Sequence, residues 1–385
     1  MIAEISSLRS RVLRKANGAL PYDYIVPNGV YEEQWDWDAF FVGLHLISVD
    51  KADGIYLKNW CRNFLHHTEP DGHTPGGIRP WAGRDARLYH LKPLMGQAAY
   101  YASISLGDFA WVAPVWEKMK ACVTYRERKM SDPATGLVKW WDSLESGADN
   151  NPALVRRFHN SVAGADVNAF MVLDYRAMAW IAARLGRDED GESFRIRAVR
   201  LNDAVNDHLW DETDATYYNF DTVEKTRLCH ITYSNQIPLW ARLASPERAR
   251  AMIERYVLDP GKLLSPFGIR SLAADDPFYN NENVIKPYSN WQGPIWPHAN
   301  WMVMHVLRHY GYPDAARSVA ERVTKLCLDD LAAHGMMHEN YHADTGAPLA
   351  APDFISWNLL AAQMIDEARD GVFLPDPSET LFKSF

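Results

Sequence analysis

The sequence predicts an all-α fold in which inner and outer helices alternate around a ring. The first observation is periodicity, because scanning the 385 residues for hydrophobic spacing gives helix after helix and few convincing strands. The second is a change of character between neighbours. Residues 38–50 are apolar nearly all round, whereas residues 53–68 carry a polar face, which is typical of a buried helix followed by a surface helix. Six such pairs in one chain predict a single (α/α)6 barrel with long loops on one rim.

The same pairing repeats along the chain. In order, the predicted inner helices are 38–50, 92–106, 166–185, 231–244, 298–310 and 353–367. Their outer partners are 53–68, 109–129, 189–210, 246–258, 314–332 and, from the other end of the chain, 4–16. Gly186 ends the third inner helix, and Ser245 with Pro246 offers a cap and a first residue to the fourth outer helix. No linker or charge run marks a boundary, so we expect residues 1–385 to form one domain.

The loops between these helices differ in length with their direction. Connections from an inner to an outer helix are short, but those from outer to inner are long: 69–91, 130–165, 211–230, 259–297 and 333–352. Long loops in a compact domain usually carry function. All of them would emerge at the N-terminal ends of the inner helices. More than half of the 15 tryptophans lie there too: Trp35, Trp37, Trp81, Trp140, Trp141, Trp291, Trp296 and Trp357.

Composition excludes several classes of partner. A formal net charge of −9 and a pI near 5.9 argue against nucleic acid or an anionic membrane, because both bind basic surfaces. The four cysteines form no CxxC pair, so we expect buried thiols in a reducing compartment. The first residues lack an apolar run long enough for a secretory signal. We therefore expect a cytoplasmic protein that binds a small molecule, and the histidine spacing predicts no metal or other cofactor.

An aromatic pocket that also holds carboxyl groups suits a carbohydrate. Sugar C–H faces pack on indole rings, and sugar hydroxyl groups pair with Asp, Glu, Asn or Gln. Hydrolysis of a glycosidic bond needs two facing carboxyl groups, one protonated and one ionised. Composition does not choose among the acidic residues of the predicted rim: Asp36, Asp38, Asp142, Glu145, Asp149, Asp166, Asp275, Asp276, Glu282, Glu339, Asp344 and Asp353.

Several loop segments carry motifs that narrow the choice. They are "QWDWDAFF" (34–41), "KPLMGQAA" (92–99), "ESGADNNP" (145–152), "QGPIWPHANW" (292–301) and "ENYHADTG" leading to "FISWNLLA" (339–361). In this order, and along almost the whole chain, they resemble the clan of inverting (α/α)6 glycosidases that includes glycoside hydrolase family 63 and the trehalases of family 37. The resemblance is closest to family 63, in particular to compact bacterial members such as mannosylglycerate and glucosylglycerate hydrolases.

The resemblance implies an inverting hydrolase of a small α-glucoside or α-mannoside, with Asp149 as the general acid and Glu339 as the general base. Such an acid needs a raised pKa, and inversion requires carboxyl groups about 6.5–9.5 Å apart, with room for a water molecule. Ala148 replaces a residue that is usually larger in the family, so we expect a different pocket shape beside the acid. The expected sugar-binding residues are Trp35, Asp36, Trp37, Asp38, Lys92, Gln97, Trp291, Gln292, Trp296 and Tyr341.

Some alternatives stay open at this stage. Asp36 and Asp38 precede an apolar helix, where each could cap the helix or bind sugar hydroxyl groups. The substrate is either a neutral disaccharide or a charged glycosyl-glycerate, to which Arg270 could contribute. A sugar epimerase on the same barrel would need a pair of histidines, and "ESGADN" and "ENY" argue against it. A non-catalytic sugar-binding protein is disfavoured because both expected carboxylates are present.

Overall fold

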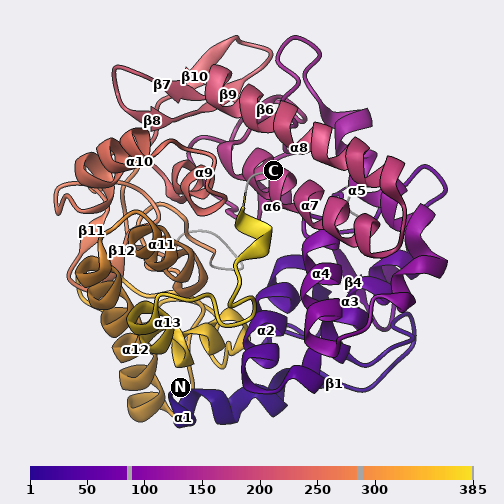
Figure 1. The fold of residues 1–385 in the computed structure, drawn as a ribbon. Helices are drawn as coiled ribbons and strands as arrows, with labels where there is room; N and C mark the ends of the chain where they lie inside the picture. Colours follow the sequence, from indigo (N-terminus) through magenta and orange to yellow (C-terminus); the bar gives the residue numbers. More distant parts are fainter. Residues whose placement is uncertain (85–88, 284–288, 384–385) are drawn as a thin grey trace.

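The computed structural model describes residues 1–84, 89–283 and 289–383, and helices dominate this part of the chain (Figure 1). An inner set of helices surrounds the centre of the molecule. It consists of α2 (Asp36–Val49), α4 (Met95–Leu106), α7 (Ala165–Arg184), η4 (Tyr233–Gln236) with α9 (Ile237–Trp240), α11 (Pro297–His309), and η6 (Ser356–Ala362) with α13 (Met364–Asp370). Each of these contacts the next, and η6 contacts α2, so the set closes into a ring.

A second set of helices lies outside this ring (Figure 1). It consists of α1 (Ala3–Ser6) with η1 (Ser7–Val12), η2 (Lys51–Asp53) with α3 (Gly54–His66), η3 (Ala110–Val115) with α5 (Trp116–Met130), α8 (Asp188–His208), α10 (Pro246–Met252) with η5 (Ile253–Val257), and α12 (Pro313–His334). Helix α2 packs on α3, α4 on α5, α7 on α8, and α11 on α12. These are the predicted pairs.

Burial explains why the helices sort into two sets. In α2 every residue from Asp36 to Ile47 is buried, as expected for a helix that is apolar nearly all round. In α8 the buried residues are Phe194, Ala198, Leu201 and Val205, which recur at helical spacing and leave the other faces to solvent. The inner helices are therefore enclosed on every side. Each outer helix packs on them through one apolar stripe and leaves its other faces to solvent.

Three segments depart most from the predicted helices. In the fourth inner segment η4 and α9 stop at Trp240, and Pro238 lacks the N–H that a continuous helix would use. The last inner helix begins at Ser356 and not at residue 353, and both Asp353 and Ser356 have positive φ angles. The N-terminal segment leaves its helix at Leu13 because β1 (Leu13–Arg14) pairs with β2 (Tyr24–Ile25).

The strands are short, antiparallel and confined to the connections. One sheet joins β3 (Gln34–Trp35), β4 (Gly77–Arg79) and β5 (Gly83–Arg84), and another joins β6 (Val162–Ala163), β9 (Asn219–Asp221) and β10 (Thr226–Leu228). Two hairpins, β7 (Trp210–Asp211) with β8 (Thr216–Tyr217) and β11 (Leu264–Ser265) with β12 (Gly268–Ile269), complete the set. Strands β3 and β6 run directly into α2 and α7, so they lie at the N-terminal ends of these inner helices.

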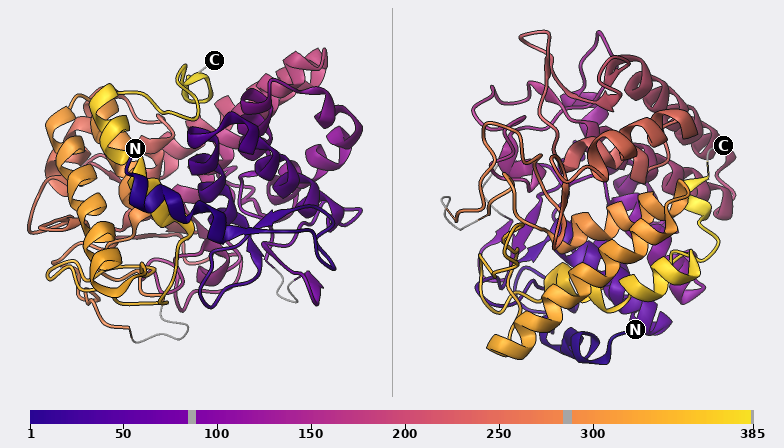
Figure 2. Two further views of the ribbon diagram at one scale, coloured as in Figure 1. Left: turned by 90° about the horizontal axis from the view of Figure 1, so that it is seen from below. Right: turned by 90° about the vertical axis from the view of Figure 1, so that its left-hand side faces the viewer.

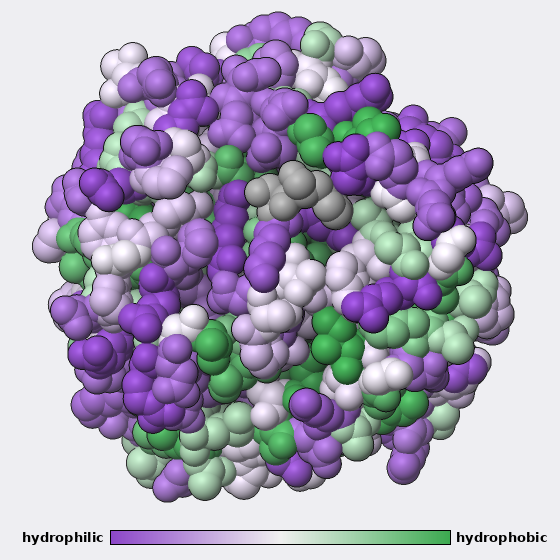
Figure 3. Space-filling model, in the orientation of Figure 1, coloured by the Kyte–Doolittle hydropathy of each residue, from purple (hydrophilic) through white to green (hydrophobic). Residues whose placement is uncertain are grey.

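The C-terminal segment covers the end of the ring opposite the one where strands β3 and β6 lie. Its last helix, η7 (Thr380–Phe382), lies near the centre of Figure 1, and Figure 2 shows it away from most of the loops and strands. Phe382 contacts Trp240 with ring centroids 4.8 Å apart, and Phe373 contacts Trp301 at 5.2 Å. The Tyr100 hydroxyl donates to Asp376 at 2.8 Å. Aromatic packing therefore closes this end, whose outer surface is mainly hydrophilic with scattered hydrophobic residues (Figure 3).

The cysteines only partly match expectation. All four are free thiols, and Cys61, Cys122 and Cys327 are buried. Cys229 is exposed, because it follows the edge strand β10 in a loop and not in a helix. Within the described ranges no helix is long and apolar enough to cross a lipid bilayer.

Candidate active site

A cavity of about 270 Å³ opens among the loops at the N-terminal ends of α2 and α11. Segments that are far apart in the sequence contribute its walls. Eight of the predicted site residues line it: Trp35, Asp36, Trp37, Asp38, Lys92, Asp149, Trp296 and Glu339. The lining also includes residues that the sequence did not single out as binding residues: Pro27, Tyr31, Gly76, Gly77, Tyr89, His90, Leu144, Glu145, Gly147, Ser289, Phe354 and Trp357.

The "QWDWD" motif turns from a strand into a helix at the cavity wall. Gln34 and Trp35 pair with β4, and a Cβ added at Gly77 would lie 2.7 Å from the Trp35 ring, so glycine is required for the indole to lie on the strand. Helix α2 then begins at Asp36. Neither Asp36 nor Asp38 is the residue that precedes the helix, and that position belongs to Trp35, which makes no side-chain cap. Simple capping therefore does not explain the two carboxylates.

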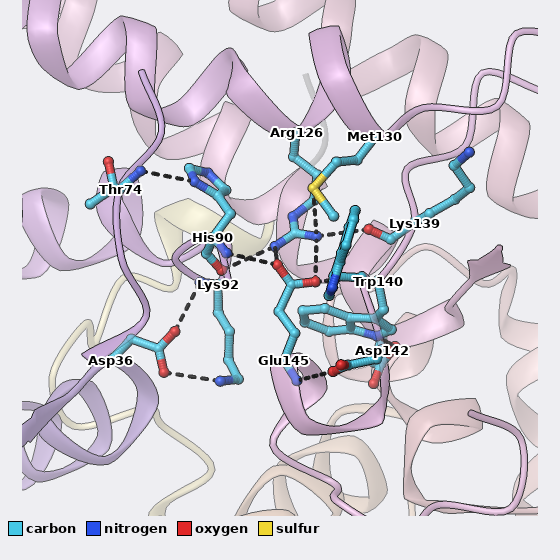
Figure 4. Close-up of polar contacts among 12 residues, drawn as sticks. Asp36, Thr74, His90, Lys92, Arg126, Met130, Lys139, Trp140, Asp142 and Glu145 are labelled. Atoms are coloured by element: carbon cyan, nitrogen blue, oxygen red, sulfur yellow. Dashed lines mark hydrogen bonds and ion pairs between the residues drawn. The ribbon is translucent and has the colours of Figure 1, made fainter. Parts of the chain in front are cut away.

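Asp36 and Lys92 join the start of α2 to the segment before α4 (Figure 4). The Lys92 backbone N–H donates to one Asp36 oxygen at 2.9 Å, and its ammonium donates to the other at 3.0 Å. Both side chains are almost fully buried, so solvent screens this ion pair little. The Lys92 ammonium also lies 5.1 Å from the centre of the Trp37 ring. The pair fixes the start of α2 against the segment before α4.

Asp38 is a buried carboxyl group that faces the cavity. The Ser356 hydroxyl donates to it at 3.0 Å, which links the first inner helix to the last. Burial raises the pKa of Asp38 to about 7, and the charge of Asp36 adds to the rise, while the Ser356 hydrogen bond opposes it. Near neutral pH this side chain is therefore divided between its protonated and ionised forms.

Glu339 reaches the cavity from the loop between α12 and η6. The loop is held by a backbone hydrogen bond from Glu339 to Ala350 at 2.9 Å. The side chain is buried, and among the described residues its Oε2 atom has no hydrogen-bond partner. Burial raises the pKa of Glu339 well above its usual range, and the nearby charges of Asp38 and Asp149 raise it further. A buried carboxyl oxygen that faces a cavity without a protein partner is suited to a ligand or a water molecule.

Asp149 lies in a loop that forms part of the cavity wall. The short helix α6 (Ser143–Ser146) is capped by Asp142 and ends at Gly147, which has a φ angle of 82°. A Cβ added at Gly147 would lie 2.5 Å from the Trp37 ring, so only glycine allows both this turn and this contact. Ala148 is buried behind the turn, and Asp149 follows with its side chain among the cavity residues.

The other predicted binding residues do not line the cavity. Trp291 stacks behind Trp296, with ring centroids 4.2 Å apart and planes 11° from parallel. The Gln97 side chain donates to two backbone carbonyl groups at 2.7 and 3.2 Å. The Gln292 amide donates to the Asn150 carbonyl group at 2.8 Å, and the buried Tyr341 hydroxyl donates to Asp330 at 3.0 Å. Of these four side chains, Trp291 directly supports a residue of the cavity wall, Trp296.

Tyr31, Phe354 and Trp357 extend the aromatic wall that the sequence predicts. The Tyr31 ring packs edge-on against Phe354 at 5.9 Å, and Phe354 contacts Trp357 at 4.8 Å. The buried His298 ring does not line the cavity, and its centroid lies 4.2 Å from that of Trp357 and 4.8 Å from that of Trp37. Tyr31 lies outside the motifs from which the sequence predicts the site.

The arrangement favours sugar chemistry with carboxyl groups. Among the described lining residues His90 is the one histidine, and its ring accepts the Thr74 N–H, which does not favour an epimerase with paired histidines. Arg270 lies elsewhere, where it pairs with Asp344 at 2.9 Å. Within the described ranges no group of three or more His, Cys, Asp or Glu side chains is arranged to hold a metal ion. Acidic side chains among indole rings, at one end of a ring of helices, suit the binding of a carbohydrate.

Comparison with known proteins identifies the family. The family model for the mannosylglycerate hydrolase MGH1-like glycoside hydrolase domain matches residues 31–357, so the chain belongs to this family. The resemblance to glycoside hydrolase family 63 is confirmed. A mannosylglycerate hydrolase from Rubrobacter radiotolerans is 29% identical over 204 residues, which are 53% of this chain. The match spans 43% of that relative, less than half of its length.

Solved structures share the fold over nearly the whole chain. A family 63 mannosylglycerate hydrolase from Thermus thermophilus, in complex with glucose, gives a TM-score of 0.76 at 23% identity, covering 94% of this chain and 99% of that one. The same enzyme in complex with Tris and D-glycerate gives 0.73 at 20% identity, covering 93% and 99%. Neutral trehalase from Saccharomyces cerevisiae gives 0.69 at 16% identity, covering 96% and 80%.

Proposed function

We propose that this protein is an inverting glycoside hydrolase that cleaves a small α-glucoside or α-mannoside, and that its substrate is a glycosyl-glycerate. One observation carries the proposal: Asp149 and Glu339, from loops far apart in the sequence, line the same tryptophan-walled cavity. The family of glycoside hydrolase domains supports the reaction. A glycerate moiety in the substrate is supported by the similarity to the Rubrobacter mannosylglycerate hydrolase and by the D-glycerate bound to the Thermus enzyme.

In the proposed reaction the two carboxyl groups act on opposite faces of the sugar. Asp149 donates its proton to the glycosidic oxygen while the bond from this oxygen to the anomeric carbon breaks. Glu339 takes a proton from a water molecule whose oxygen forms the new bond to that carbon, so the configuration inverts. We propose that the carboxyl groups lie about 6.5–9.5 Å apart, the separation that leaves room for this water.

The remaining cavity residues would bind and orient the sugar. Trp35, Trp37 and Trp296 offer indole surface for its C–H faces, and Asp38 can accept from or donate to hydroxyl groups because its pKa is about 7. We assign Lys92 and Asp36 the role of holding the wall, since each satisfies the other. Gln97, Trp291, Gln292 and Tyr341 would act from behind the wall.

A substrate panel tests the reaction and the sugar together. We expect the protein to hydrolyse an α-glucosyl- or α-mannosyl-glycerate faster than the corresponding neutral disaccharides. NMR spectra recorded in the first minutes should show the β-anomer of the released sugar before mutarotation mixes the two. Release of the α-anomer would contradict inversion. Binding of these glycosides in a calorimeter without release of sugar would contradict hydrolysis.

The pH dependence of the rate should report the proposed base. Glu339 must be ionised to act, and the Asp38 charge helps to raise its pKa. On acidification the rate should therefore begin to fall at a higher pH than it would if the base were an ordinary glutamate with a pKa of about 4.5. In Asp38→Asn this midpoint of kcat/KM should move to lower pH. Glu33→Gln is the matched control, because Glu33 pairs with Arg79 at 3.5 Å outside the cavity and should leave the midpoint unchanged.

We further propose a barrel architecture and a cellular location for this protein. The closed inner ring and its outer helices are consistent with an (α/α)6 barrel made by residues 1–385 as one domain. Similarity to the Thermus hydrolase and to the trehalase over nearly the whole chain supports this reading. A cytoplasmic location is supported by the four free thiols, which suit a reducing compartment.

A further inference from the structure

We propose that Asp149 is aimed by a clamp with two buried arms, the Asn150 amide with Gln292 on one side and the Arg126–Glu145 ion pair on the other. These four are positioning residues, since the general acid itself is Asp149. The inference rests on the proposed function, because it assigns the clamp to the step in which the leaving group is protonated.

The first arm holds the residue directly after Asp149. The Asn150 side chain is buried and uses both ends of its amide. Its Oδ1 accepts the Trp291 N–H at 2.5 Å, and its Nδ2 donates to Asn290 at 2.9 Å. The Asn150 carbonyl group accepts from the Gln292 side chain at 2.8 Å. Three hydrogen bonds therefore join this residue to the segment that precedes α11.

The second arm holds the residue four positions before Asp149 (Figure 4). Arg126 and Glu145 form an ion pair in which each side chain is only 1% exposed, with guanidinium hydrogen bonds of 3.0 and 3.2 Å. The Glu145 carboxylate also accepts the His90 N–H at 2.9 Å and the Trp141 N–H. Arg126 donates to the Lys139 and His90 carbonyl groups at 2.7 and 3.3 Å. The guanidinium comes from the outer helix α5, so the acid loop is anchored to the helical frame.

The short span between the arms is fixed as well. Gly147 lies against Trp37, and Ala148 is buried, so the turn leaves little freedom for the backbone of Asp149. Both arms end on buried polar groups that keep their partners only in this geometry. Movement of the turn would leave several of these groups unpaired, which is costly away from water. The backbone from which the Asp149 side chain extends is thereby held in place at the cavity wall.

Two substrates with different leaving groups distinguish a misplaced general acid from a general disturbance of the structure. Fluoride departs from an α-glycosyl fluoride with little need for a proton, whereas an alkoxide such as that of glycerate needs the general acid. Gln292→Met keeps the side-chain size but removes the donor to Asn150. The double variant Arg126→Met/Glu145→Gln removes both charges together, because loss of one partner would strand a buried charge.

We expect each clamp variant to lower kcat/KM for the glycosyl-glycerate by about 10²-fold and to change kcat/KM for the glycosyl fluoride by less than about 3-fold. The control is Asp330→Asn, because Asp330 binds the His338 N–H at 2.9 Å and the Tyr341 hydroxyl at 3.0 Å on either side of Glu339. It should lower both rates in parallel. Thermal unfolding curves identify folded variants, and Gln292→Met tests the proposal if the double variant does not fold.

A parallel loss on both substrates in Gln292→Met, or no loss on the glycosyl-glycerate, would overturn the clamp. Wild-type protein that hydrolyses both substrates while the variants behave in this way would leave the proposed function intact. Wild-type protein that hydrolyses neither would overturn the proposed function, and the clamp with it. The two failures are therefore distinguishable in one set of measurements.

Discussion

Glu339→Gln is expected to lower kcat for a glycosyl-glycerate by about 10³–10⁴-fold, at the upper end of what a general base contributes. The amide has nearly the shape of the carboxylate but cannot take a proton from the attacking water. Substrate binding should persist, because the aromatic wall is unchanged. Single-turnover rates with purified variant and wild type, together with calorimetric affinities, check both statements. Turnover within about 10-fold of wild type would remove Glu339 from the role of base.

The same variant should be more stable than wild type near neutral pH. Glu339 has a folded-state pKa raised above its unfolded value of about 4.5, so the folded state binds its proton more tightly. The stability associated with this proton is fully present below pH 4.5 and is lost as pH rises towards the folded pKa. Glutamine carries no charge at any pH. The difference in Tm should therefore favour the variant at pH 7 and shrink towards pH 4. A lower Tm at pH 7 would show that Glu339 stabilises the fold.

Asp149→Asn is expected to lower kcat/KM for a glycosyl-glycerate by about 10³-fold while the α-glycosyl fluoride remains a substrate. Asparagine cannot protonate the departing oxygen, and fluoride hardly needs this proton. The comparison is made with initial rates on both substrates in the same protein preparation. Equal losses on both substrates would show that Asp149 does more than protonate the leaving group.

A matched control for this variant lies on the same rim. Asp344→Asn removes another carboxylate, one that pairs with Arg270 at 2.9 Å and does not line the cavity. Its rates on both substrates should stay within about 2-fold of wild type, since the Asp344 side chain is 44% exposed and does not line the cavity. A large loss in Asp344→Asn would extend the functional surface to the loop that carries Arg270.

The sequence predicted the helices well because their signal is local. Hydrophobic spacing located α7 and α8 to within two residues at each end, and Ser245 caps α10 as expected, accepting the Arg248 N–H. The helices that were wrong have two different causes, a proline that hydrophobic spacing alone does not register and a strand pairing. Pro238 interrupts the backbone hydrogen bonds of the fourth inner segment, and Leu13 leaves its helix to pair with Ile25. Pairing with a distant strand gives no periodic signal.

The sequence indicated which residues belong to the candidate site better than it indicated where their side chains point. Motif matching selected Asp149, Glu339 and three of the tryptophans that line the cavity, Trp35, Trp37 and Trp296. It could not show that the Gln292 side chain points towards Asn150 and away from the cavity. Asn150 lies far from Gln292 in the sequence, and only the tertiary fold brings the two together. The buried pairing of Arg126 was also hidden. An arginine on an amphipathic outer helix normally faces solvent, and only the tertiary fold brings Glu145 to it.

The position of η7 has a practical consequence. Phe382 packs on Trp240 and Arg242 at the ring end opposite the loops that frame the cavity. Attachment to a bead, a sensor chip or a carrier protein through a linker fused at the C-terminus should therefore leave the cavity facing the surrounding solution. The protein could be immobilised in one uniform orientation, with diffusion of small sugars to it unimpeded.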